Sequence, residues 1–137
     1  MKSARRSVAT AIRDVLLTGE ATAKVFAARQ VARDWRLGRL DFVFDVAMPD
    51  RPAWPAALEL LPPGLMPRRG KMGSQRNRIA LWHALAHIEF VAIDLALDMA
   101  GRFGESMGET FVSDFLAVAA DEAMHFALIA RKLDSLG

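Results

Sequence analysis

The fold is decided by residues 82–100, WHALAHIEFVAIDLALDMA, and by residues 111–133, FVSDFLAVAADEAMHFALIARKL. Apolar residues recur in both stretches at intervals of three and four, which places them on one face of an α-helix. Ionisable residues interrupt both apolar faces: Glu89 in the first, Glu122 and His125 in the second. Because a buried carboxylate without a partner costs several kcal/mol, we expect a compensating group, and we interpret that group as a metal ion.

Composition limits the class of protein. The chain has 137 residues, of which 53% are apolar, and this suits one folded domain and excludes disorder. It contains no cysteine, so disulfides, thiolate zinc sites and thiol nucleophiles are excluded. The absence of cysteine also suits a reducing cytoplasm, which is the location that we expect. The net charge is only +2 and no nucleic-acid module is recognisable, so we expect no nucleic-acid partner.

We expect neither export nor insertion into a membrane. Arg5-Arg6 is similar to the start of a twin-arginine signal, but Arg13-Asp14 interrupts the apolar region that such a signal requires. The apolar run over residues 79–100 has nearly the length of a membrane span. Its histidines and acidic residues favour a helix that is buried in protein instead.

The sequence predicts a single domain over residues 1–137, made of three parts. Residues 1–38 form N-terminal helices, and Gly38 is well placed to end the last of them. Residues 39–74 contain all six prolines, which forbid a long helix, but they are too apolar for a free linker. We therefore expect an ordered Pro-rich strap over the helices. Residues 75–137 form a hairpin of two long helices.

The hairpin has expected boundaries. The first helix should cover about residues 75–102, with Gly101 and Gly104 closing it, and Thr110 or Ser113 can open the second. Since the connection between them is short, the two helices should lie antiparallel.

Glu122 and His125 form a Glu-x-x-His motif. A spacing of three puts both side chains on one helix face with Cβ atoms ~5–6 Å apart, so they can bind one metal or two adjacent metals. Oxygen and imidazole ligands without sulfur suit iron or manganese. Asp121 can hold an imidazole by its second nitrogen. The alternatives are an exposed hydrogen-bonded pair for Glu122 and His125, and a structural ion pair for Glu89.

Two other polar clusters are weaker candidates. His83 and His87 lie one helical turn apart and could bind a divalent metal, but no third ligand is evident, so we interpret them as packing histidines. At ~100° per residue His87 points ~200° away from Glu89, so the two cannot both bind one metal, and His87 stays only a candidate outer partner. The basic run from Arg68 to Arg78 could receive an anionic group, although a solvated charge cluster is the simpler interpretation.

Five segments of the sequence resemble a bacterial ferritin-like family that is known only as a domain of unknown function. They are HALAHIEFVAIDL at 83–95, DEAMHFALIARKL at 121–133, WRLG at 35–38, PDRP at 49–52 and MPRR at 66–69. The resemblance implies an all-α, ferritin-like four-helix bundle with a carboxylate-bridged dinuclear centre of iron or, alternatively, manganese. By that match Glu89 would be the ligand from the first helix, and Glu122 and His125 those from the second.

One chain would supply half of such a centre. The centre needs two lone glutamates and two Glu-x-x-His pairs, but this sequence contains a single Glu-x-x-His. Members of the family look longer and continue into two more helices. We favour a homodimer in which two copies pair about a twofold axis and complete both the bundle and the site. The alternative is that the chain is the N-terminal half of a longer protein.

The resemblance carries no settled activity. Our first hypothesis is an oxidoreductase in which the metal pair activates oxygen or peroxide to oxidise a substrate. The second is iron binding or sequestration without turnover, and the third is a metal-free helical interaction module. We expect no hydrolysis, since no nucleophile or acid–base pair independent of the metal is evident.

Overall fold

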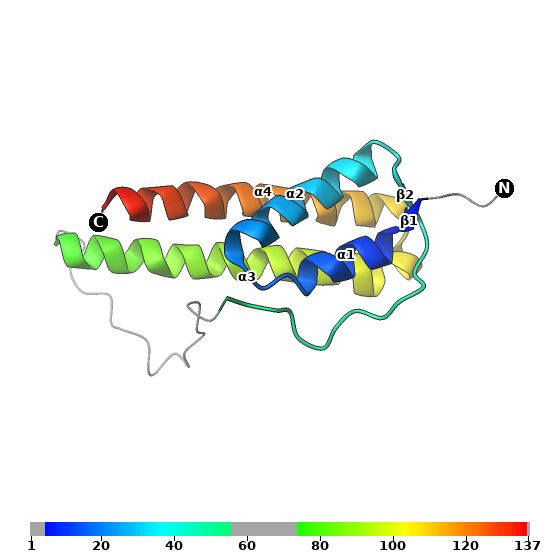
Figure 1. The fold of residues 1–137 in the computed structure, drawn as a ribbon, viewed down its shortest axis with the longest axis horizontal. Helices are drawn as coiled ribbons and strands as arrows, with labels where there is room; N and C mark the ends of the chain where they lie inside the picture. The colour runs from blue at the N-terminus through cyan, green and yellow to red at the C-terminus, as the bar shows by residue number, and fades with distance from the viewer. Residues whose placement is uncertain (1–4, 56–73, 137) are drawn as a thin grey trace.

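The structure, a computed structural model, describes residues 5–55 and 74–136 (Figure 1). The protein is mostly helical, which agrees with the all-α prediction. Its helices are α1 (Val8–Leu16), α2 (Ala21–Arg36), α3 (Gln75–Met107) and α4 (Glu109–Ser135). Two short strands that we did not predict, β1 (Arg6–Ser7) and β2 (Leu40–Asp41), pair in parallel.

The long helices α3 and α4 lie side by side and run in opposite directions (Figure 1). The short helix α1 packs on α3, and α2 packs on α4. The largest fully buried apolar side chains come from α1, α3 and α4, and are Val8, Ile12, Leu16, Phe90, Ile93, Leu97, Val112 and Leu116. One core therefore joins the N-terminal helices to the hairpin.

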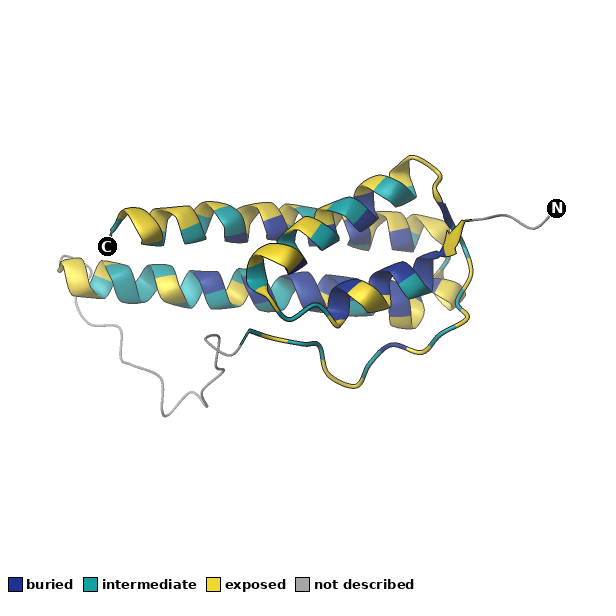
Figure 2. Ribbon diagram, in the orientation of Figure 1, coloured by how far each residue is buried: buried dark blue, intermediate teal, exposed yellow. Residues whose placement is uncertain are grey.

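The other end of the hairpin has little cover. Residues 75–85 of α3 and residues 127–135 of α4 include no buried residue (Figure 2). Both segments extend past α1 and α2 at the end where α3 begins and α4 ends (Figure 1). The described part of the chain therefore buries only one half of the hairpin.

Side-chain caps explain where the N-terminal helices start. Ser7 Oγ accepts the backbone N–H of Thr10 at 3.0 Å, which caps α1. The carboxylate of Glu20 caps α2 by accepting the N–H groups of Ala23 and Thr22 at 2.6 and 3.1 Å. These two bonds stabilise the charged form, and so they lower the pKa of Glu20.

The first long helix does not end where we expected. We predicted a helix over residues 75–102, but α3 continues to Met107, and Gly108 with φ of 101° separates it from α4. Gly101 and Gly104 are buried inside α3. They allow close packing of neighbouring side chains against the helix, and this function of glycine competes with its tendency to end helices.

We predict that Gly104→Ala destabilises the protein. The new methyl carbon would lie 2.6 Å from Cγ2 of Val112, a fully buried and stiff β-branched side chain, and 3.0 Å from the ring of Phe44. Such overpacking costs about 1–3 kcal/mol, which should exceed the gain of at most about 1 kcal/mol in helix propensity. Urea unfolding measures the difference. Gly101→Ala is the matched comparison, because its methyl would lie closest to the side chain of Met48, which is flexible and can shift, so it should lose less stability than Gly104→Ala. A Gly104→Ala protein as stable as Gly101→Ala would contradict the prediction.

The segment over residues 39–55 runs along the helices. The side chain of Met48 is buried, and the indole N–H of Trp54 donates a hydrogen bond of 2.8 Å to Oδ2 of Asp94 on α3. The remaining part of the predicted strap, together with the start of the predicted basic run, falls on residues 56–73 and lies outside the described residues.

A buried ion pair holds this segment against two helices. The ammonium of Lys24 on α2 is fully buried and donates to Asp94 Oδ1 at 2.7 Å, to the carbonyl of Ala53 at 2.6 Å and to that of Leu16 at 3.4 Å. Burial lowers the pKa of Lys24 and raises the pKa of Asp94, because both charged forms lose contact with water. One lysine thus joins α1, α2, α3 and the segment after β2.

Among the described helices, α3 has the length and apolar composition of a membrane-spanning helix. The core helix of a soluble protein can have the same length and composition. Only 28% of the apolar stretch is buried in the described structure, so this helix has a large surface for further contacts.

Candidate metal centre

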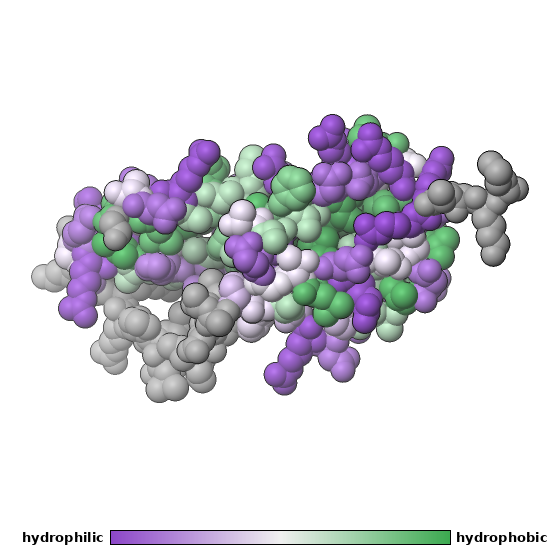
Figure 3. Space-filling model, in the orientation of Figure 1, coloured by the Kyte–Doolittle hydropathy of each residue, from purple (hydrophilic) through white to green (hydrophobic). Residues whose placement is uncertain are grey.

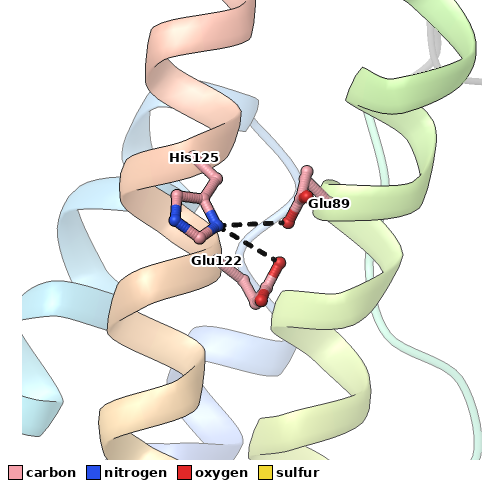
Figure 4. A group of neighbouring side chains, drawn as sticks. All are labelled: Glu89, Glu122 and His125. Atoms are coloured by element: carbon pink, nitrogen blue, oxygen red, sulfur yellow. Dashed lines mark ion pairs between the residues drawn. The ribbon is translucent and has the colours of Figure 1, made fainter.

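The hairpin brings the three predicted metal ligands together (Figure 4). Glu89 points from α3 toward α4, where Glu122 and His125 occupy successive turns. Nδ1 of His125 lies 3.7 Å from Oε2 of Glu89 and 3.8 Å from Oε2 of Glu122. One ligand atom from each residue lies within 4.8 Å of the others. Within residues 5–55 and 74–136, this is the one group of three such side chains that could hold a metal ion.

Packing of two aromatic rings sets the position of these ligands. Phe90 follows Glu89 and is fully buried, and Phe126 follows His125 and is almost fully buried. Their rings meet edge to face with centroids 5.1 Å apart. Because each ring is the chain neighbour of a candidate ligand, this contact between α3 and α4 keeps Glu89 opposite His125.

The two carboxylates of this group are more buried than the imidazole, and one carboxylate oxygen has no described hydrogen-bond donor. The side chains of Glu89 and Glu122 are 21% and 23% exposed, whereas that of His125 is 48% exposed. Oε2 of Glu89 is buried and has no hydrogen-bond partner among the described residues. The contacts to His125 exceed hydrogen-bond length, and the two carboxylates repel each other at this separation. A buried acceptor without a donor costs about 1–3 kcal/mol, so a positive group bound between these residues would stabilise the folded protein.

The donor set fits one divalent cation. Two carboxylate oxygens and an imidazole nitrogen, with no sulfur, are ligands that iron and manganese accept. A cation bound between them would satisfy Oε2 of Glu89 and remove the repulsion between the carboxylates. Three protein ligands do not make a dinuclear centre, so a pair of metals would need ligands from outside this group.

The other predicted site residues are not in this group. Asp121 is exposed and lines a groove between α2 and α4, with no hydrogen bond to His125. His87 is half-buried and His83 is exposed on α3, and neither forms an ion pair or hydrogen bond with a described residue. An outer role for Asp121 or His87 thus remains a prediction.

Sequence reasoning missed the buried cation. Lys24 lies four residues before Ala28 and seven before Val31, both of which are buried. That spacing places the lysine on the apolar face of α2 and could have shown that it is buried. Its partner Asp94 was expected only as one of several polar residues on the first hairpin helix.

Residues 17–137 match the family described as "Protein of unknown function (DUF455)". The chain belongs to this family. An uncharacterized protein of Haemophilus influenzae is 41% identical over 103 residues, which cover 71% of this chain and 35% of that protein. The chain thus spans about a third of the length of this relative. No solved structure matches the chain. The match confirms membership of a family of unknown function, and the ferritin-like character that the resemblance implied stays a proposal.

Proposed function

We propose that Glu89, Glu122 and His125 form half of a dinuclear iron or manganese centre in a ferritin-like bundle, and that the completed protein is an oxidoreductase. The observation that carries this proposal is the buried oxygen of Glu89, which has no described donor and faces a carboxylate and an imidazole. Oxygen and nitrogen ligands without sulfur favour iron or manganese over softer metals.

The roles of the side chains follow from their positions. Glu89 and Glu122 would hold cations from two different helices, and His125 would present Nδ1, the nitrogen that faces both carboxylates. The pair Phe90 and Phe126 keeps these ligands in register. An iron or manganese pair, when bound, supplies the one-electron steps that activate oxygen or peroxide. His125 is half-exposed, which leaves one side of the centre open to a small molecule.

The missing ligands are proposed to come from a second copy of the chain. The outward face of α3 carries apolar or small side chains at intervals of three and four residues, none of them fully buried. They are Leu81, Leu85, Ile88, Ala92, Leu95 and Met99. Ile88 and Leu95 are 59% and 61% exposed. Such spacing is typical of a helix that packs against another helix.

The position of Glu89 supports a partner at this face. Glu89 follows Leu85 by four residues and precedes Ala92 by three, so it borders the exposed stripe. A helix pair that covers the stripe would pass close to Glu89 and could bring its own carboxylates to the same cations. A twofold axis here would supply two glutamates and two Glu-x-x-His pairs in total. Further residues of a longer chain could fill the same place, as the greater length of the relative allows.

Oxygen consumption tests the proposed activity. Protein purified without metal is loaded anaerobically with Fe²⁺, its mass is measured by light scattering, and oxygen uptake is followed with and without a chemical reductant. We expect a dimer with about one iron per chain, and uptake that continues as long as reductant is supplied. A monomer that binds two metals tightly would contradict the half-site, and a protein that takes up no oxygen would contradict the oxidoreductase.

One observation favours a second function, iron sequestration. The described cavities of about 150 to 630 Å³ are lined by residues other than Glu89, Glu122 and His125. An enzyme needs room for its substrate beside the metals, whereas a carrier does not. Oxygen uptake that stops once the bound iron is oxidised, even with reductant present, would support sequestration. A protein that binds neither iron nor manganese would favour the third hypothesis, a metal-free helical interaction module.

A further inference from the structure

A groove between α2 and α4 has features of a second binding site. Two cavities of about 630 Å³ each lie along it and share Ala32, Arg36, Ala120 and Asp121 as lining residues. Each volume falls in the range of roughly 300–1,000 Å³ that is usual for small-molecule sites. Neither cavity is lined by a candidate metal ligand, so the groove is distinct from the metal centre.

Three arginines line the α2 side of the groove. Arg29, Arg33 and Arg36 follow one another at intervals of four and three residues, so they share one helix face. All three are exposed, and none of their guanidinium groups forms an ion pair or hydrogen bond with a described residue. Like charges at this spacing repel each other, and the carboxylate of Asp121 across the groove does not pair with them. The groove therefore has uncompensated positive charge on one wall.

Large apolar side chains line the same cavity. Phe26 is 70% exposed, Leu37 is 50% exposed and Met124 is 43% exposed. Hydrophilic and apolar side chains lie next to each other over α2 and α4 on the face that Figure 3 shows. A cluster of exposed apolar side chains beside unpaired guanidinium groups marks a surface that binds something both apolar and anionic.

We propose that this groove binds an organic ligand with two or more phosphates and a flat apolar ring, the chemistry of a nucleoside diphosphate. Guanidinium groups bind phosphate oxygens in a forked, two-bonded geometry, and three of them suit a ligand with several phosphate oxygens. The ring would lie against Phe26 and Met124, where it gains apolar contact. The phosphates would lie on the α2 side, because Asp121 on the α4 side repels them.

Calorimetric titration of the full chain tests the proposal, with ADP, inorganic pyrophosphate and adenosine as probes. EDTA in the buffer removes divalent cations, so the result does not depend on the metal centre. We expect ADP to bind more tightly than either pyrophosphate or adenosine, since each of these lacks one half of the ligand. Arg33→Glu should weaken ADP binding by about tenfold or more, because a charged hydrogen-bond partner is lost and a repulsive charge is added.

Matched variants separate the groove from general charge effects. Arg13→Glu makes the same charge change at an exposed residue of α1 that lines neither cavity, and it should leave ADP affinity within about twofold. Asp121→Asn should tighten ADP binding, because it removes the repulsive carboxylate. Circular dichroism identifies any variant that fails to fold, and Arg29→Gln then replaces Arg33→Glu.

Four results would overturn the proposal. They are no binding of ADP, equal affinity for pyrophosphate and ADP, an unchanged ADP affinity in folded Arg33→Glu, and stronger binding of a polyglutamate peptide than of ADP. The last result would instead indicate an acidic protein as the occupant of the groove.

Discussion

Glu122→Gln and His125→Ala are each expected to bind iron and manganese at least about 100-fold more weakly than wild type. Each variant removes one of three clustered ligand groups, and even the loss of an outer hydrogen-bond partner of a metal ligand costs roughly 10–100-fold. Competition with a chelator of known affinity, followed by metal analysis, measures the change.

Matched controls show whether the loss is specific. Asp114→Asn removes an exposed carboxylate from α4, and His83→Ala removes an exposed imidazole from α3, both outside the clustered group. Both controls should bind metal as wild type does. Equal metal affinity of Glu122→Gln, His125→Ala and the two controls would contradict the metal centre. A loss of metal binding in His83→Ala alone would indicate that His83 and His87 bind the metal instead.

Stability of the metal-free protein gives a second measurement of the same prediction. Glu89→Gln removes one of two close carboxylates and should raise the melting temperature of the metal-free protein. The same variant should lose the increase in melting temperature that added metal gives to wild type. Opposite changes of this kind are expected when residues are retained for binding at a cost to stability. A purely structural ion pair would instead lose stability when Glu89 is replaced.

Lys24→Met is expected to destabilise the protein by about 3–5 kcal/mol, the usual effect of removing one partner of a buried ion pair. The variant leaves the carboxylate of Asp94 buried, with only the indole of Trp54 as a described donor. Asp94→Leu should cost a similar amount, because it leaves the ammonium of Lys24 without its anion. Chemical unfolding monitored by circular dichroism measures both losses.

Two comparisons test whether burial is the cause. The double variant Lys24→Met/Asp94→Leu should recover most of the loss, since replacing both partners by apolar groups leaves no buried charge. Asp98→Asn breaks the ion pair with Arg102, where the two side chains are 32% and 42% exposed, and should cost less than about 1 kcal/mol. Equal losses for Lys24→Met and Asp98→Asn would contradict the prediction.

The raised pKa of Asp94 gives this ion pair a dependence on pH. The folded protein protonates Asp94 at a higher pH than the unfolded chain, whose carboxyl has the ordinary value of 3.8. Stability contributed by this residue therefore falls as the pH rises from about 3.8 through its folded pKa. Unfolding curves of wild type and of the double variant should consequently diverge over this range, with wild type becoming relatively less stable.

Helical periodicity predicted the two long helices and the pairing of Glu122 with His125, because both depend on local spacing. Glu122 and His125 are three residues apart and therefore share one helix face. The apolar residues around Glu89 recur at helical spacing, which indicates that this side chain lies on the face that packs against another helix. Their meeting across the hairpin depends on the register of α3 against α4, which the contact of Phe90 with Phe126 sets. Spacing within each helix does not give that register.

Features that depend on contacts distant in sequence were not predicted. The ion pair joins residues 24 and 94, and the indole bond joins residues 54 and 94, so no local pattern contains them. The glycines of α3 were expected to end the helix, because their close contacts with Met48 and Val112 become visible only in three dimensions. The strands β1 and β2 have two residues each, which is too short for an alternation of apolar and polar residues to be recognised in the sequence.

Gly108 is the one residue between the two helices that carry the candidate ligands. Their mutual contacts therefore need little loop closure, and contacts of this kind form early when a chain folds. Residues 89, 122 and 125 would meet before the first 41 residues dock onto the pair. A cation that binds the hairpin at this early stage would stabilise it and speed the folding of the remaining chain. Metal would then bind during synthesis and folding of the protein rather than afterwards.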